Sequence, residues 1–137
     1  MEEVVVGRAI PAWLDVVHAS LDRFRTAIDA SGSPLPGPSV WTEFAIGLVE
    51  IATNVIQYAY PSSGPAGEFE VRLRLYADRL EALLTDHGQP FVESRLDAPG
   101  DLAEGGYGLP LTRRALDRVE YRRDSSGRNH WHLAKFL

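Results

Sequence analysis

Two polar side chains lie one helical turn apart in a segment that is otherwise apolar. Glu50 and Asn54 fall within Val40–Tyr60, where apolar residues surround most of the circumference of the helix that the sequence predicts. At about 100° per residue, the two side chains share a narrow polar stripe. Burying an unpartnered carboxylate is costly, so the stripe is expected to meet solvent, a cation or a ligand. A capping or surface stripe on a helix at the sheet edge is the alternative.

A second group of residues follows a predicted strand. The run from Asp86 to Phe91 comes directly after Leu80–Thr85. An aspartate at the end of a strand can accept a hydrogen bond from an exocyclic amine, and Gly88 would let the backbone approach a flat ligand closely. Taken alone, Asp-His-Gly is also an ordinary turn sequence.

A cluster of glycines opens the last predicted helix. Gly105, Gly106 and Gly108 precede or begin this helix. Free backbone N–H groups at such a position can point at phosphate, and the positive end of the helix dipole assists them. The spacing matches neither a P-loop nor a G-x-G-x-x-G fingerprint. The alternative is a flexible hinge.

The hydrophobic pattern predicts the elements that must hold these three motifs. Strands are expected at Val4–Val6, Glu68–Leu75, Leu80–Thr85, Val119–Asp124 and His130–Phe136, and helices at Ala12–Ala30, Val40–Tyr60 and Gly108–Arg118. Pro90–Gly105 follows neither period and is expected to be a mobile loop. Strand pairs that adjoin in the sequence, with helices between the pairs, favour an α+β two-layer sandwich.

Composition limits the classes of protein to which the chain can belong. Its 137 residues carry a net charge of −5 and no cysteine, which indicates one domain over residues 1–137 and excludes disulfides and thiolate metal sites. Without a strong basic excess, direct binding to nucleic acid is not expected. The start of the sequence lacks a basic leader, and no run offers the roughly 18 apolar residues of a membrane span. We therefore expect a cytoplasmic protein without a membrane partner.

Basic residues gather near the end of the sequence. Residues 106–137 carry seven basic and three acidic side chains, although the chain as a whole is acidic. These arginines could face phosphate or an acidic partner, or form a solvated face paired with nearby carboxylates. His130 and His132 lie two apart on a predicted strand. Without a third ligand we interpret them as an exposed strand face and not as a metal pair.

In this order, the three motifs resemble the N box, G1 box and G2 box of the GHKL ATPase superfamily. Within it, the run Glu50-Ile51-Ala52-Thr53-Asn54 and the G-x-G-L-x-L form of Gly106–Leu111 are similar to those of the bacterial anti-sigma factor serine kinases. The resemblance spans nearly the whole chain. It implies the Bergerat α/β sandwich, in which helices cover one face of a mixed, mostly antiparallel sheet.

The resemblance also implies roles for the matching residues. Asn54 corresponds to the asparagine that ligates Mg²⁺, and Glu50 to the glutamate proposed as general base. Asp86 corresponds to the aspartate that binds the adenine amino group of ATP, and Gly88 makes room for the ring. The glycines that correspond to the phosphate-contacting positions are Gly106 and Gly108.

The chain departs from the family pattern at two places. Tyr58 stands four residues after Asn54, where the family often has histidine. The segment Val92–Gly105 corresponds to the ATP lid and is short, so closure over the γ-phosphate could be incomplete.

The resemblance implies that the chain acts as an ATP-binding anti-sigma regulatory factor. Such a protein holds a sigma factor inactive and uses Mg-ATP to phosphorylate a serine on a STAS-domain antagonist, and the family resemblance also suggests a homodimer. A non-catalytic partner-switching module that keeps nucleotide as a structural cofactor is one alternative. A stand-alone catalytic domain of a histidine kinase is another, and an α+β domain whose glycines serve only turns is the third.

Overall fold

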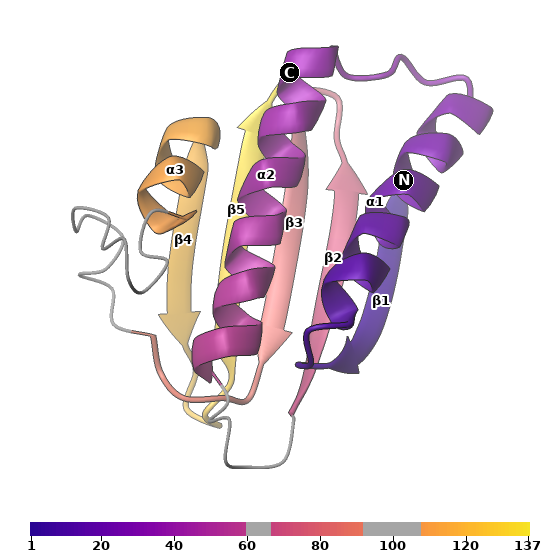
Figure 1. The fold of residues 1–137 in the computed structure, drawn as a ribbon. Helices are drawn as coiled ribbons and strands as arrows, with labels where there is room; N and C mark the ends of the chain where they lie inside the picture. The colour runs from indigo at the N-terminus through magenta and orange to yellow at the C-terminus, as the bar shows by residue number, and fades with distance from the viewer. Residues whose placement is uncertain (60–66, 92–107) are drawn as a thin grey trace.

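Five strands and three α-helices form the part of the chain that the computed structural model describes, residues 1–59, 67–91 and 108–137 (Figure 1). The strands are β1 (Glu2–Arg8), β2 (Glu68–Leu75), β3 (Arg79–Asp86), β4 (Arg118–Arg123) and β5 (Asn129–Phe136). The helices are α1 (Trp13–Ala30), α2 (Pro38–Asn54) with a π-helical turn at Val55–Ala59, and α3 (Gly108–Ala115).

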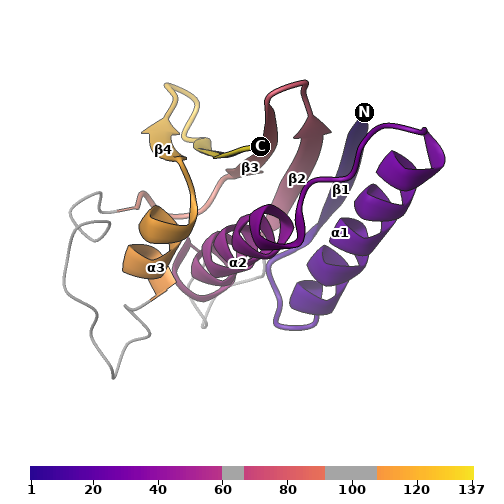
Figure 2. The ribbon, with the colours of Figure 1, turned by 90° about the horizontal axis from the view of Figure 1, so that it is seen from above.

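The strands form one sheet in the order β1-β2-β3-β5-β4, with the helices on one face and the other face bare (Figure 2). This arrangement confirms the predicted α+β sandwich. One detail differs, because every neighbouring pair in the described sheet is antiparallel, whereas a mixed sheet was expected. The cause is the position of β5. It lies between β3 and β4, which run in the same direction, and so separates the two strands that could have formed a parallel pair.

The core lies between the sheet and the helices. On β2, the side chains of Val71 and Leu73 are fully buried, while their neighbour Arg72 lies on the bare face. This period of two is the signal from which the strand was predicted, and β2 has the predicted bounds. Phe24 of α1 and Phe44 of α2 are fully buried from the other side. Each such side chain stabilises the fold by about 1.5–3 kcal/mol relative to an exposed position.

Helix α2 is the central helix of the helical layer. Its residues Leu48 and Ile51 are fully buried, as expected for a helix that is apolar around most of its circumference. By length and composition alone, the 20 residues Pro38–Gln57, with a mean hydropathy of 1.2, could cross a membrane, contrary to the expectation that no segment could. A buried core helix passes the same test, and this one packs between α1 and α3 over the sheet (Figure 2).

Leu116, the residue that follows α3, packs very closely against α2 at Gly47. A Cβ atom added to Gly47 would lie 2.5 Å from Cδ1 and 2.6 Å from Cγ of the buried Leu116. Replacing Gly47 by Ala is therefore expected to lower the free energy of unfolding by about 1 kcal/mol, since overpacking of about 1–3 kcal/mol exceeds the gain of about 1 kcal/mol in helix propensity. Urea unfolding measures this difference.

Gly37 provides the matched control for this prediction. It precedes α2 with φ of −58°, and an added Cβ would meet no atom within 4 Å. Gly37→Ser also adds a Cβ atom and keeps a residue that is favoured at a helix N-cap, so it should change the free energy of unfolding by only a few tenths of a kcal/mol. Equal stability of the Gly47→Ala and Gly37→Ser variants would contradict the close contact between Gly47 and Leu116.

Candidate functional site

Three of the predicted site residues lie at the ends of elements. Asn54 is the last residue of α2, Asp86 is the last residue of β3, and Gly108 is the first residue of α3. Figure 1 shows that α2 and β3 finish at the same end of the molecule, opposite the end that holds both chain termini. The fold thus brings the first two motifs to one end of the sheet, as the sequence analysis requires.

Asn54 is buried but remains available to a ligand. Its side chain is 7% exposed, and no hydrogen bond joins its amide to another group in the described parts of the chain. The helix changes to a π-helical turn at the next residue, Val55, a deformation that is frequent at functional sites. An amide oxygen without a partner in the described parts of the chain fits a hard cation such as Mg²⁺, which prefers oxygen ligands.

The polar stripe of α2 lies beside neighbouring elements of the fold and is partly open to solvent. Glu43 lies two turns before Glu50. Its carboxylate forms an ion pair with Lys135 of β5, with 2.5 Å between Nζ and Oε2. Between these two positions, Gly47 contacts Leu116. Glu50 itself is half-buried. The stripe therefore runs along the side of α2 that faces α3 and β5, with its carboxylates partly exposed.

Asp86 is almost completely buried at the end of β3. Its side chain is 1% exposed, and its Oδ1 accepts hydrogen bonds of 2.8 Å from the backbone N–H of Gly88 and of 2.8 Å from Nδ2 of Asn129. Burial raises the pKa of this carboxyl, and the two hydrogen bonds oppose that rise. Asp86 and Gly88 thus do form a turn, and the turn fixes one carboxylate oxygen inside the fold.

Three residues of the β4–β5 hairpin form hydrogen bonds with this turn, and none of them was predicted as a residue of the nucleotide site. Asn129 lies opposite Asp86 in the β3–β5 register, and its amide reaches the carboxylate. Arg123 is exposed, and its Nη1 donates to the carbonyl oxygen of Gly88 at 3.0 Å. Tyr121 accepts the backbone N–H of Phe91 at 2.9 Å. The sequence signal that could have indicated this contact is the polar residue Asn129 beside the predicted strand His130–Phe136.

Part of the predicted phosphate site lies outside the described residues. Gly106 and most of the expected loop Pro90–Gly105 fall there. Gly108 begins α3, as the glycine cluster predicted. The helix ends at Ala115, earlier than the predicted Arg118, because Arg118 already pairs with Ala134 as a strand residue.

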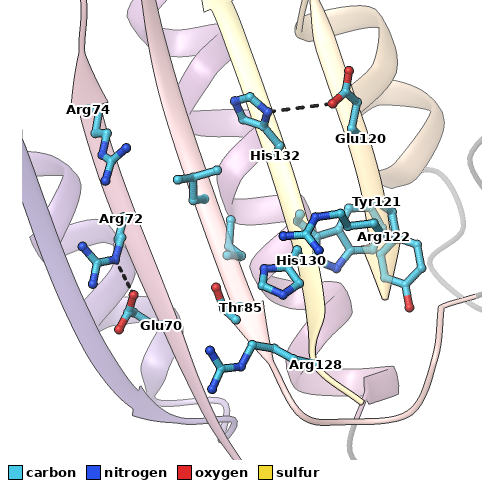
Figure 3. Close-up of a pocket in the computed structure, with 13 residues that line it drawn as sticks. Glu70, Arg72, Arg74, Thr85, Glu120, Tyr121, Arg122, Arg128, His130 and His132 are labelled. Atoms are coloured by element: carbon cyan, nitrogen blue, oxygen red, sulfur yellow. Dashed lines mark hydrogen bonds and ion pairs between the residues drawn. The ribbon is translucent and has the colours of Figure 1, made fainter. Parts of the chain in front are cut away.

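The two histidines of β5 lie on the bare face of the sheet, away from this site (Figure 3). His130 pairs with Asp124, with 2.8 Å between Nε2 and Oδ2, and His132 contacts the carboxylates of Glu81 and Glu120. Within residues 1–59, 67–91 and 108–137, no group of three or more His, Cys, Asp or Glu side chains could hold a metal ion. The interpretation as a strand face agrees with this finding, although both histidines are half-buried.

Comparison with known proteins identifies the type of domain that the three sequence motifs resemble. A family profile described as a histidine kinase-like ATPase domain matches residues 8–134. A protein of Halalkalibacterium halodurans named serine-protein kinase RsbW is 36% identical over an alignment of 93 positions, and the alignment covers 61% of this chain and 56% of that protein. The protein of the same name from Bacillus licheniformis is 32% identical over 93 residues, 61% of this chain and 58% of its own length.

A solved structure shows the same fold. The histidine kinase domain of a blue-light-activated histidine kinase from Erythrobacter litoralis superposes with a TM-score of 0.57 at 17% identity, covering 87% of this chain and 60% of that one. The alignments to the two curated relatives span little more than half of their length.

Proposed function

The chain belongs to the histidine kinase-like ATPase family, and on that premise we propose that it binds ATP and transfers the γ-phosphoryl group to a serine of a partner protein. The observation that carries the proposal is the buried Asp86, which offers a carboxylate oxygen beside a turn closed by Gly88. The similarity to proteins named serine-protein kinase supports the choice of serine as acceptor.

Asp86 and Gly88 would bind the adenine base. Both hydrogen bonds to Asp86 in the described part of the chain fall on Oδ1, so Oδ2 is the atom that accepts from the exocyclic amine. Adenine carries such an amine, and its flat ring needs the close approach that a glycine backbone permits. The phosphates would then extend toward the ends of α2 and α3, where Asn54 and Gly108 lie.

Asn54 is the residue that would hold Mg²⁺ through its amide oxygen. When bound, this ion supplies positive charge that stabilises the phosphate oxygens during transfer. Glu50, one turn earlier on the same side of α2, would accept the proton of the serine hydroxyl. In this step the serine Oγ forms a bond to Pγ, and the bond from Pγ to the bridging oxygen breaks. ADP leaves with that electron pair, and the proton goes to the Glu50 carboxylate.

As partners we propose a sigma factor and a STAS-domain antagonist, exchanged in the cytoplasm according to whether the antagonist is phosphorylated. The similarity to proteins named serine-protein kinase RsbW supports this proposal. The homodimer suggested by the resemblance stays a prediction. Gly106 and Gly108, as phosphate contacts, also stay predictions.

The experiment that tests this function is transfer of label from γ-labelled ATP. The purified chain is incubated with Mg²⁺, the labelled nucleotide and a STAS-domain protein from the same organism. We expect acid-stable label on a serine of that protein, and no label when the serine is replaced by alanine. Acid-labile label on a histidine would support the histidine-kinase alternative. ATP binding without label on any partner would support the non-catalytic module.

A further inference from the structure

Three side chains of the β4–β5 hairpin, Tyr121, Arg123 and Asn129, hold the residues that follow β3. We call these three the hairpin clamp. Asn129 is only 1% exposed, and both ends of its amide are hydrogen-bonded. A buried amide with all its groups partnered fixes its neighbours, because moving any of them leaves an unpaired polar group inside the protein.

The orientation of the Asn129 amide is determined by its partners. Its Nδ2 donates to Oδ1 of Asp86 at 2.8 Å, and also lies 3.2 Å from the carbonyl oxygen of Gly88 and 3.1 Å from that of Gln89. Its Oδ1 accepts from Nη1 of Arg123 at 2.9 Å. A guanidinium can only donate and a carbonyl can only accept, so the opposite amide orientation is excluded.

Tyr121 completes this chain of hydrogen bonds. Its hydroxyl accepts the backbone N–H of Phe91 at 2.9 Å and therefore donates its own proton to Oδ1 of Asn129, 2.5 Å away. The ring of Phe91 packs against Tyr121 and Trp131, with centroid distances of 5.5 and 4.7 Å. The hairpin thus holds Gly88, Gln89 and Phe91 at their backbones, and Phe91 also at its ring.

Asp86 receives its orientation from the same clamp. Oδ1 is occupied by Asn129 and by the backbone of Gly88, which leaves Oδ2 to face a ligand. The hydrogen bond from Asn129 lowers the pKa of Asp86 and so opposes the larger effect of burial. Without that bond, Asp86 would more readily take up a proton, and a protonated carboxyl can donate to a carbonyl oxygen as well as accept from an amine.

We propose that Asn129 is a positioning residue that makes the base site select an exocyclic amine, by holding Asp86 with Oδ1 filled and Oδ2 free. This inference rests on the proposed nucleotide site and deepens it. Tyr121 and Arg123 act through Asn129, since they fix the amide that fixes the carboxylate. The β4–β5 hairpin therefore determines base specificity without contacting the base.

The test compares ATP with ITP, which carries a carbonyl oxygen where ATP carries the amine. Dissociation constants for both nucleotides are measured by calorimetry on the wild-type chain and on Asn129→Leu. The wild-type chain is expected to prefer ATP by about 100-fold, because a buried acceptor left facing a carbonyl oxygen is costly. In Asn129→Leu the preference should fall to within about fivefold. If Asn129 only supports the fold, both affinities fall by the same factor and the preference is unchanged.

A second variant keeps the test valid if Asn129→Leu does not fold. Tyr121→Phe retains the ring that packs on Phe91 and Trp131 but removes the hydroxyl, and should reduce the preference to about tenfold. The matched control is His130→Gln, the next residue on β5, whose side chain lies on the bare face of the sheet. It should leave the preference at the wild-type value.

The outcomes separate this inference from the proposed function. A wild-type chain that binds neither nucleotide overturns the proposed function and the inference with it. A wild-type chain that binds ATP and ITP equally leaves ATP binding in place and overturns amine selection. A wild-type preference for ATP that persists in both Asn129→Leu and Tyr121→Phe overturns the role of the hairpin clamp alone.

Discussion

Replacing Asp86 by Asn is expected to weaken ATP binding at least about 100-fold while leaving the fold intact. The two side chains have the same shape, but the hydrogen bonds of this site determine how the new amide must lie. The donors from Gly88 and Asn129 both point at the position of Oδ1, so the amide oxygen has to occupy that position. The amide NH2 group then takes the place of Oδ2 and meets the amine of the base, donor against donor.

Calorimetric titration with Mg-ATP measures this loss, and thermal unfolding checks that the variant is folded. Thr85→Val is the matched control, because Thr85 precedes Asp86 on β3 and faces the bare side of the sheet (Figure 3). Its affinity for ATP should equal that of the wild-type chain. Unchanged affinity in a folded Asp86→Asn variant would show that the base binds elsewhere.

Replacing Glu50 by Gln should spare ATP binding and lower the rate of phosphoryl transfer about 100- to 10,000-fold. Glutamine keeps the size of the side chain and can orient a hydroxyl, but it cannot accept the proton that the serine must lose. The rate is measured as label transferred to the STAS-domain protein at saturating ATP.

Glu43→Gln makes the same chemical change on the same helix, two turns before Glu50, and serves as control. Glu43 pairs with Lys135, so this variant can lose some stability, but its transfer rate should remain at the wild-type value. A full transfer rate in Glu50→Gln would move the general base to another residue.

The strands and helices were predictable where the apolar residues recur with a single period, two residues in a strand or 3.6 in a helix. Strand β2 has the predicted bounds, since its alternation is unbroken from Glu68 to Leu75. Strand β1 is longer than the predicted Val4–Val6, because Glu2 and Arg8 pair with β2 although they are charged. The π-helical turn after Asn54 was not predicted, since neither its composition nor its period differs from that of the helix before it.

The candidate site was predictable where its residues are neighbours in sequence. Asp86 and Gly88 lie two residues apart, and a local motif finds both. Asn129 lies 43 residues from Asp86, and the contact between them depends on the β3–β5 register, which the hydrophobic pattern does not specify. Arg123 was counted among the basic residues near the end of the sequence, because charge alone does not tell which face of β4 a side chain occupies.

The most direct test of a nucleotide site at the ends of α2 and β3 is calorimetric titration of the wild-type chain with ATP, with and without Mg²⁺. We expect binding of one ATP per chain, stronger with Mg²⁺ because Asn54 would add an oxygen ligand to the ion. Absence of ATP binding under both conditions would contradict the account, since the buried carboxylate of Asp86 would then have no base to bind.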